Sequence, residues 1–220
     1  MGANNTDSNK SVKFYSLKAK VDATNDPHFS LSEKIDDSWK VTGTFNEMFG
    51  VITKAEIIEK TFEGQVSKIF RLQLTDENEV SFLDMTHNTV TYSILNTLAS
   101  DFDTTKEIKL RVYKTENVSE KDGKTYFNGR SFITTGEDSI KWAYEVKDLP
   151  RAEQVFKKDG TPLKANGFNV YDKEEVLKFW ENMFLKDVQP KFNPQNFTSS
   201  HSTEKSPTPA VEDEVDSLPF

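Results

Sequence analysis

The chain has 220 residues, of which 35% are hydrophobic and 29% are charged, and its net charge at pH 7 is -8. The absence of cysteine excludes disulfides, thiolate metal sites and cysteine nucleophiles. A mean hydropathy of -0.66 is low for a fully globular chain, so we expect one ordered domain with disordered extensions. The acidic total speaks against a general basic footprint, so any nucleic-acid binding must depend on a local cluster of bases.

Residues 1–38 are polar and weakly patterned, which predicts an N-terminal arm. They lack the basic-then-apolar pattern of a signal peptide, and no apolar run in the chain approaches membrane-spanning length. We therefore expect a cytoplasmic protein without a membrane partner.

Three segments with strand character follow, over residues 49–65, 66–76 and 79–86. Turn signals at Glu63-Gly64 and at residues 76–78 separate them. Residues 87–102 then predict a helix, because a capping residue (Asn88 or Thr89) precedes apolar residues at helical spacing. These apolar residues are Val90, Ile94, Leu95 and Leu98.

Two alternating segments, residues 106–117 and 124–134, flank a turn at residues 121–123 and predict a β-hairpin. Three strands, a helix and a two-stranded hairpin is the order of the OB fold. We therefore expect a mainly β protein in which residues 39–147 form a five-stranded OB barrel, with one helix between the third and fourth strands. The first strand is long enough to pair with both the second and the fourth, and residues 139–146 suggest one more short strand.

Residues 148–188 predict a helical appendix. Pro150 suits the first turn of a helix over residues 151–158, and Asp172 with Glu175 resembles a capping box for a second helix. An apolar stripe at helical spacing indicates packing against the barrel, or alternatively a dimer or partner surface. The stripe comprises Val176, Phe179, Trp180, Met183 and Phe184.

The tail, residues 189–220, predicts a disordered acidic extension. Its last part carries five acidic residues against Lys205, which leaves a charge of -4. The tail then finishes on Leu218-Pro219-Phe220, an apolar tip that suits docking on a partner, because a side chain and a terminal carboxylate are recognised together in a known binding mode. The carboxylates also suit weak competition with phosphate. An apolar end without a partner is the alternative.

Enzymatic function is not indicated by any motif. The three histidines, His28, His87 and His201, are scattered, and neither a nucleophile elbow nor a phosphate-binding glycine loop is present. The acid pairs, at residues 101/103 and 137/138, fall in turn-like contexts where acids usually cap or face solvent. We expect no catalytic residue, no metal and no cofactor.

The predicted hairpin is the most informative segment. From Lys106 to Arg130 it carries seven bases and four acids, a charge of +3 within an acidic chain. If the apolar residues at 108, 110 and 112 point inward, alternation places the intervening cations and Tyr113 on the outer face. The candidate strand-binding residues are Arg71, Phe82, Lys109, Arg111, Tyr113, Lys114, Lys124, Tyr126 and Arg130.

Cations between aromatic rings favour binding of an unpaired nucleic-acid strand, because phosphates are attracted to the charge and unpaired bases stack on the rings. The alternative is a solvated outer face with good β propensity. Phe132, which shares the alternation of Tyr126 and Arg130, and Phe127 fit a core position equally well.

The strand pattern and the tail together resemble one family, the single-stranded-DNA-binding proteins of bacteria and their phages. The family's tail ends in an acidic run, an isoleucine or similar residue, proline and phenylalanine, and the matching residues here are Asp216, Leu218, Pro219 and Phe220. Val215 and Ser217 interrupt the acidic run. Residues 39–142 resemble phage members of the family, chiefly through residues 110–128 and 136–146.

The resemblance implies a non-enzymatic coat for exposed single strands in DNA replication, recombination or repair. It implies that the tip recruits replication proteins such as a polymerase, a helicase or primase, or a recombinase, in the host cytoplasm if the protein is phage-encoded. Two alternatives stay open: an OB module that binds protein and not nucleic acid, and a metal-dependent nuclease. The preference between DNA and RNA, and the choice between monomer and homodimer, are open as well.

Overall fold

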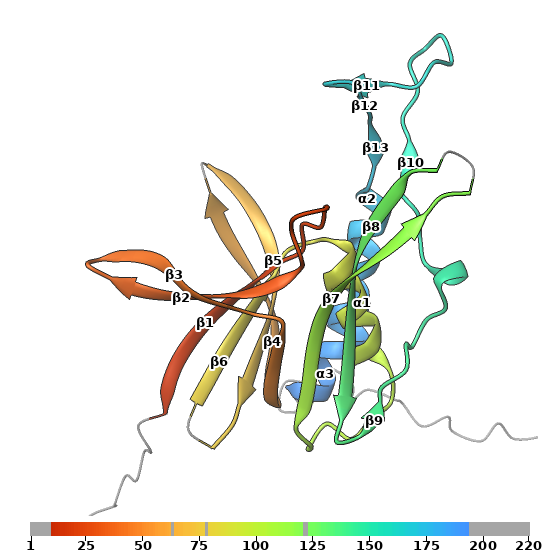
Figure 1. The fold of residues 1–220 in the computed structure, drawn as a ribbon. Helices are drawn as coiled ribbons and strands as arrows, with labels where there is room; N and C mark the ends of the chain where they lie inside the picture. Colours follow the sequence, from red (N-terminus) through yellow and green to blue (C-terminus); the bar gives the residue numbers. More distant parts are fainter. Residues whose placement is uncertain (1–9, 63, 78, 121–122, 194–220) are drawn as a thin grey trace, which may run out of the picture.

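The computed structural model describes residues 10–62, 64–77, 79–120 and 123–193. Its main feature is a nine-stranded mixed sheet with the spatial order β3-β2-β1-β6-β5-β4-β7-β8-β9 (Figure 1). The strands are β1 (Ser11–Lys18), β2 (His28–Ile35), β3 (Ser38–Phe45), β4 (Glu47–Phe62), β5 (Gln65–Thr75), β6 (Glu79–Met85), β7 (Ile108–Val118), β8 (Thr125–Thr135) and β9 (Asp138–Ser139).

Strand β4 holds the two parts of the sheet together. Its first residues pair with β7, with Glu47 opposite Arg111, and the rest of its 16 residues pair with β5 from Val51 onward. Gly50 lies where the strand changes partners, with φ 140°, and a Cβ there would lie 3.2 Å from the Leu74 side chain. The predicted pairing of one long strand with two neighbours is confirmed. We call β4, β5, β6, β1, β2 and β3 the broad limb, and β7, β8 and β9 the hairpin limb.

The predicted closed OB barrel is wrong. Instead of closing onto β8, β6 pairs in parallel with β1, with Phe14 opposite Phe82, and β2 and β3 extend the sheet beyond β1. The N-terminal arm expected over residues 1–38 therefore supplies β1, β2 and the start of β3, and the expected boundary at residue 39 falls inside β3. Four consecutive residues of β1, at positions 13–16, are half-buried, so the strand lacks the clean alternation that marks one buried face.

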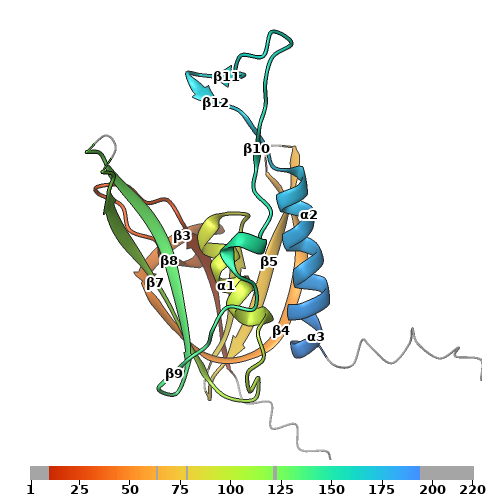
Figure 2. The same ribbon diagram turned by 90° about the vertical axis from the view of Figure 1, so that its right-hand side faces the viewer.

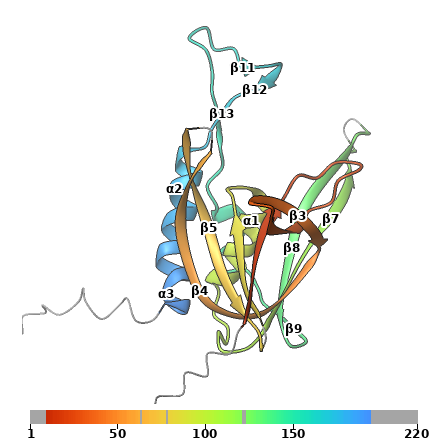
Figure 3. The ribbon, with the colours of Figure 1, turned by 90° about the vertical axis from the view of Figure 1, so that its left-hand side faces the viewer.

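Helix α1 (Thr89–Ala99) is where the sequence predicts it. The Asn88 side chain accepts a hydrogen bond from the Thr91 N–H at 2.9 Å, and all four predicted apolar residues are fully buried. A second helical stretch comprises α2 (Glu174–Met183), a π-helix (Phe184–Val188) and α3 (Gln189–Phe192). Figure 2 shows α1 between the β7–β8 hairpin and α2, and Figure 3 shows α2 and α3 beside β4 from the opposite side.

The apolar stripe of this second helical stretch packs into the core, as one of the two predicted alternatives has it. Trp180 stacks on Tyr92 with ring centroids 4.6 Å apart, and Phe184 contacts Phe70 at 5.1 Å. The Asn193 side chain then bonds both backbone groups of Ala55, donating to its carbonyl at 2.7 Å and accepting from its N–H at 3.2 Å. These contacts fix the helices against β4.

The segment before α2 differs from the prediction. The helix expected over residues 151–158 is instead extended backbone, because Val155 bonds to the backbones of Val170 and Leu163. Residues 149–172, which we call the projecting loop, extend away from the sheet (Figure 1). The loop contains β10 (Glu153–Gln154), β11 (Lys164–Ala165), β12 (Phe168–Asn169) and β13 (Tyr171–Asp172). The extra strand expected over residues 139–146 is also wrong, since only the two residues of β9 and a short 3-10 turn, Val146–Asp148, are regular there.

The disordered tail was expected to begin at residue 189, but residues 189–192 form α3 and Phe192 is buried. The rest of the predicted tail, including its tip, lies outside the described residues. Within the described part of the chain, no helix is long and apolar enough to cross a membrane.

Candidate nucleic-acid interface

Side chains alternate between the two faces of the β7–β8 hairpin where it packs on the core. There the inward residues, such as Leu110, Val112 and Ile133, are buried, and the outward residues between them, apart from the buried Thr134, are exposed or half-buried. The antiparallel register places Tyr113 opposite Arg130 and Arg111 opposite Phe132. We call the outward set the hairpin face, which consists of Lys109, Arg111, Tyr113, Tyr126, Arg130 and Phe132.

The rings of the hairpin face are available to solvent. Tyr113 is 39% exposed, Tyr126 51% and Phe132 44%. Phe132, which the sequence left open as a possible core residue, therefore belongs to the surface. Phe127 is half-buried and lies beneath the Lys114 ammonium, 5.4 Å from it. Lys124 is exposed just before β8.

Glu47 is a residue of this surface that the sequence did not reveal. Its carboxylate lies 3.0 Å from the Lys109 ammonium and 3.5 Å from the Arg111 guanidinium. Lys109 also lies over the Phe49 ring, 5.3 Å from its centroid. The only signal for these contacts in the sequence is the predicted pairing of residues 49–65 with residues 106–117, which correspond to β4 and β7. Two of the predicted cations are thus already paired with a carboxylate.

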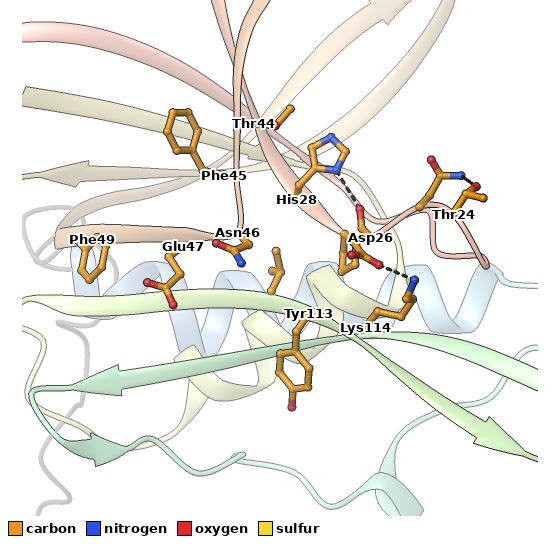
Figure 4. Close-up of a pocket in the computed structure, with 13 residues that line it drawn as sticks. Thr24, Asp26, His28, Thr44, Phe45, Asn46, Glu47, Phe49, Tyr113 and Lys114 are labelled. Carbon is orange, nitrogen blue, oxygen red and sulfur yellow. Dashed lines mark hydrogen bonds and ion pairs between the residues drawn. The ribbon is translucent and has the colours of Figure 1, made fainter.

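A cleft of about 910 Å³ adjoins the hairpin face (Figure 4). It lies between the β1–β2 loop, the end of β3, the start of β4 and the middle of β7, and Tyr113 is among its lining residues. Phe45 and Phe49 add two further rings, 45% and 51% exposed. The aromatic character of the hairpin face therefore continues into a concave surface.

Lys114 does not belong to the hairpin face. Its ammonium lies 2.7 Å from the Asp26 carboxylate and donates to the Asp22 carbonyl at 3.2 Å, and only 16% of its side chain is exposed. Figure 4 shows Lys114 and Tyr113 pointing to opposite sides of β7. Hydrogen bonds from Asn25 and Thr24 hold the pKa of Asp22 well below its usual range. Lys114 thus fastens the β1–β2 loop to β7.

Arg71 and Phe82 lie on the broad limb, separated from β7 by β4. Arg71 donates to both carboxylate oxygens of Asp84, at 2.7 and 3.0 Å, and Lys60 donates to the same carboxylate at 2.5 Å. Burial alone would raise the pKa of Asp84, but the hydrogen bonds from Arg71 and Lys60 outweigh it and lower the pKa. The charge of Arg71 is therefore already compensated.

A separate ring cluster surrounds Phe82. The Phe82 ring stacks on Phe14 at 5.4 Å, and the Trp39 ring, 60% exposed, meets Phe14 edge-on at 5.4 Å. Neither Phe14 nor Trp39 was predicted as a neighbour of Phe82, because Phe14 falls in the expected arm and Trp39 at the very start of the expected barrel. The predicted site residues thus form a set on the hairpin limb and a smaller set on the broad limb.

Among the described residues, no group of three His, Asp or Glu side chains is placed to hold a metal ion. Comparisons of the chain with models of known protein families, with curated proteins and with solved structures found no match.

Proposed function

We propose that the protein binds single-stranded DNA with little sequence preference and protects exposed strands during replication, recombination or repair, as its likeness to phage members of the family suggests. The observation that carries the proposal is the pairing of rings with cations across β7 and β8. Tyr113 lies opposite Arg130 and Arg111 opposite Phe132, all four exposed on one face. Such a face is notable in a chain whose net charge is -8.

The chemistry of this face suits an unpaired strand. Each base stacked on an aromatic side chain contributes about 1–3 kcal/mol, and every base has a face to stack. Cations beside the rings neutralise phosphates and release counterions, which lowers affinity as salt rises. The bases of a duplex already stack on one another and have no free face for the aromatic rings, so a duplex should compete poorly for this face.

The adjoining cleft gives the strand a path beyond the hairpin. Phe49 and Phe45 line the cleft, which has a volume of about 910 Å³, and Tyr113 belongs to the strand that borders it. We place the bases on the exposed rings and the phosphates along Lys109, Arg111 and Arg130.

The test is a fluorescence anisotropy titration of labelled oligo-dT with the full chain and with Tyr113→Ala and Tyr126→Ala. Loss of one stacked base lowers affinity about 5- to 150-fold, in line with 1–3 kcal/mol. Phe168→Ala is the matched control, because Phe168 is 78% exposed in the projecting loop, and it should leave affinity unchanged. Unchanged affinity in both tyrosine variants, with normal circular dichroism, would favour a protein-binding module instead.

Competition with unlabelled RNA and duplex DNA of equal length completes the assay. We expect duplex DNA to compete at least tenfold more weakly than oligo-dT. The outcome with RNA decides whether the sugar hydroxyl is tolerated, since that group is what distinguishes the two strands chemically.

The proposed recruitment of replication proteins by Asp216, Leu218, Pro219 and Phe220 depends on the sequence alone, because these residues lie outside the described ones. Deletion of residues 212–220 should leave DNA affinity equal or higher, since competing carboxylates are removed. A replication protein that binds the full chain should lose that binding on the same deletion.

A further inference from the structure

A second cavity, of about 580 Å³, lies among α1, α2 and the segment that leads into the projecting loop. Its lining is chiefly apolar and includes Trp142, Leu149, Val176 and Leu177, with the stacked Tyr92 and Trp180 rings as its floor. Three exposed cations, Arg130, Arg151 and Lys173, also line it. An apolar hollow with basic groups at its margin suits a ligand that is both apolar and acidic.

Beside this cavity lies an edge of β8 that, over residues 125–131, pairs with no strand among the described residues. β9 pairs with β8 only at Thr134 and Thr135, and just beyond them the Ile140 N–H donates to the Ile133 carbonyl. Because backbone groups alternate between the two edges of a strand, Ser131 and Gly129 direct theirs to the same edge as Ile133. In the described part of the chain no strand pairs with this edge over residues 125–131, and Gly129 lines the cavity.

We propose that this cavity is a peptide-binding site in which an extended segment adds to the free edge of β8. We further assign its occupant as residues 212–220 of this same chain. Strand addition gives affinity through the main chain, and side-chain pockets beside the edge give specificity. The site is separate from the proposed DNA surface except for Arg130, so it stands or falls independently of DNA binding.

The composition of residues 212–220 matches the cavity. Glu212, Asp213, Glu214 and Asp216 provide four carboxylates for the three basic groups, and Leu218-Pro219-Phe220 provides an apolar end for the apolar lining. Proline is accepted in an added strand where its position points away from the pairing edge. The cavity thus offers the two chemistries that this segment carries side by side.

The length of the intervening chain also fits. The helical stretch from Glu174 to Asn193 spans about 30 Å at 1.5 Å per residue, and its first residues flank the cavity. Residues 194–211 reach about 60 Å when extended, at about 3.3 Å per residue. The segment therefore reaches the cavity on its own molecule without strain.

The first test uses the absence of native cysteine. We attach bimane, a dye that tryptophan quenches on contact, to Ser217→Cys in the full chain. Trp142, which is 40% exposed in the cavity wall, is the expected quencher. Emission should rise at least twofold in Trp142→Phe and in the double variant Arg151→Glu/Lys173→Glu.

The matched control is Trp39→Phe, since Trp39 is 60% exposed on the broad limb, away from the cavity. It should leave emission unchanged. Equal emission from the labelled protein with and without Trp142 would overturn the proposal. Quenching that grows with protein concentration would overturn the assignment to the same chain and would place the segment on a second copy.

The second test concerns strand addition itself and is read by hydrogen exchange of individual amides. The Gly129 and Ser131 amides should exchange at least tenfold faster in Leu218→Asp/Phe220→Asp than in the native chain. The Val112 amide, which bonds to the Asn46 carbonyl at 2.9 Å, is the internal control and should not change. Equal exchange at Gly129 and Ser131 in both proteins would exclude pairing at this edge.

Discussion

The Glu47 carboxylate lies 3.0 Å from the Lys109 ammonium, beside a hairpin face whose three charged residues, Lys109, Arg111 and Arg130, are all basic. Arg111 reaches the same carboxylate at 3.5 Å. A DNA phosphate approaching either cation must therefore displace Glu47 or accept its repulsion. In the proposed complex Glu47 therefore limits how much of the charge of Lys109 and Arg111 a DNA strand can use.

Substituting Glu47→Gln should raise the affinity for oligo-dT about 2- to 30-fold at low salt, because Glu47 makes two exposed ion pairs that are worth about 0.2–1 kcal/mol each. Anisotropy titration measures the change. Glu153→Gln, an exposed acid in the projecting loop, is the control with the same loss of charge. A fall in affinity for Glu47→Gln alone would mean that Glu47 positions the cations and does not compete with phosphate.

Arg130 makes no ion pair with any described residue, so in the proposed complex its charge serves phosphate, or the carboxylates of residues 212–220 when these occupy the second cavity. Arg130→Ala should weaken oligo-dT binding and make the log–log salt slope less negative by about 0.7, the value for one phosphate contact on a single strand. Titration at four salt concentrations gives the slope. Lys164→Ala, on the projecting loop, should change neither quantity. An unaltered slope for Arg130→Ala would remove Arg130 from the interface.

Arg71 should act on stability more than on DNA. Arg71→Ala deprives the half-buried Asp84 of two hydrogen bonds, and we expect a loss of about 1–3 kcal/mol in the free energy of unfolding. Urea denaturation measures that loss, and oligo-dT affinity should stay within about twofold. If affinity fell as far as in Tyr113→Ala while stability held, the broad limb would belong to the DNA surface after all.

Asn193 should contribute to the stability of the fold, because its one side chain bonds both backbone groups of Ala55. Asn193→Ala leaves the backbone N–H and carbonyl of Ala55, a fully buried residue, without their partners, and we expect a cost of about 1–3 kcal/mol. Thermal denaturation checks the cost against Asn169→Ala, which alters an exposed residue of the projecting loop. Equal melting temperatures would show that α3 is not anchored through Asn193.

His87 should make stability fall as the pH drops below about 6.5. Burial lowers the pKa of His87, and Glu181, 3.7 Å away, only partly opposes the shift. Since the unfolded chain titrates near pH 6.5 and the folded one lower, protons bind preferentially to the unfolded state as the pH falls. The contribution of neutral His87 to the free energy of unfolding is therefore complete above about pH 6.5 and decreases as the pH falls toward the lowered pKa of the folded state. Melting curves should show this decline, and His87→Gln should flatten it.

Local patterns sufficed for the hairpin and for α1. In both elements one face is buried and the other is exposed to solvent. Apolar residues therefore recur every second position in the strands and every three or four positions in the helix. The same reasoning correctly placed Arg111 and Tyr113 in water. Lys114 was included in the candidate set although position 114 shares the inward parity of Val112, and its ammonium lies beside Asp26 and not on the hairpin face.

Long-range pairing was beyond such patterns. The pairing of residues 11–18 with residues 79–84 leaves no pattern in the sequence. Both faces of β1 are partly covered, so its apolar and polar residues do not alternate. The prediction of a helix over residues 151–158 was wrong for a related reason. The backbone of Val155 bonds to Leu163 and Val170, which are distant in sequence, and not to residues one helical turn away. Glu47 joined the candidate site only because β4 pairs with β7.

The parallel pairing of β1 with β6 also bears on synthesis. While the ribosome extends the chain, the first strand emerges early and must wait for residues 79–85 before its second edge is occupied. Until then that edge, with Phe14 beside it, is open to any extended chain nearby. An N-terminal truncation made to remove a supposedly dispensable leader would separate the β2–β3 hairpin from the remaining sheet, and recombinant versions should therefore keep Ser11–Lys18 intact.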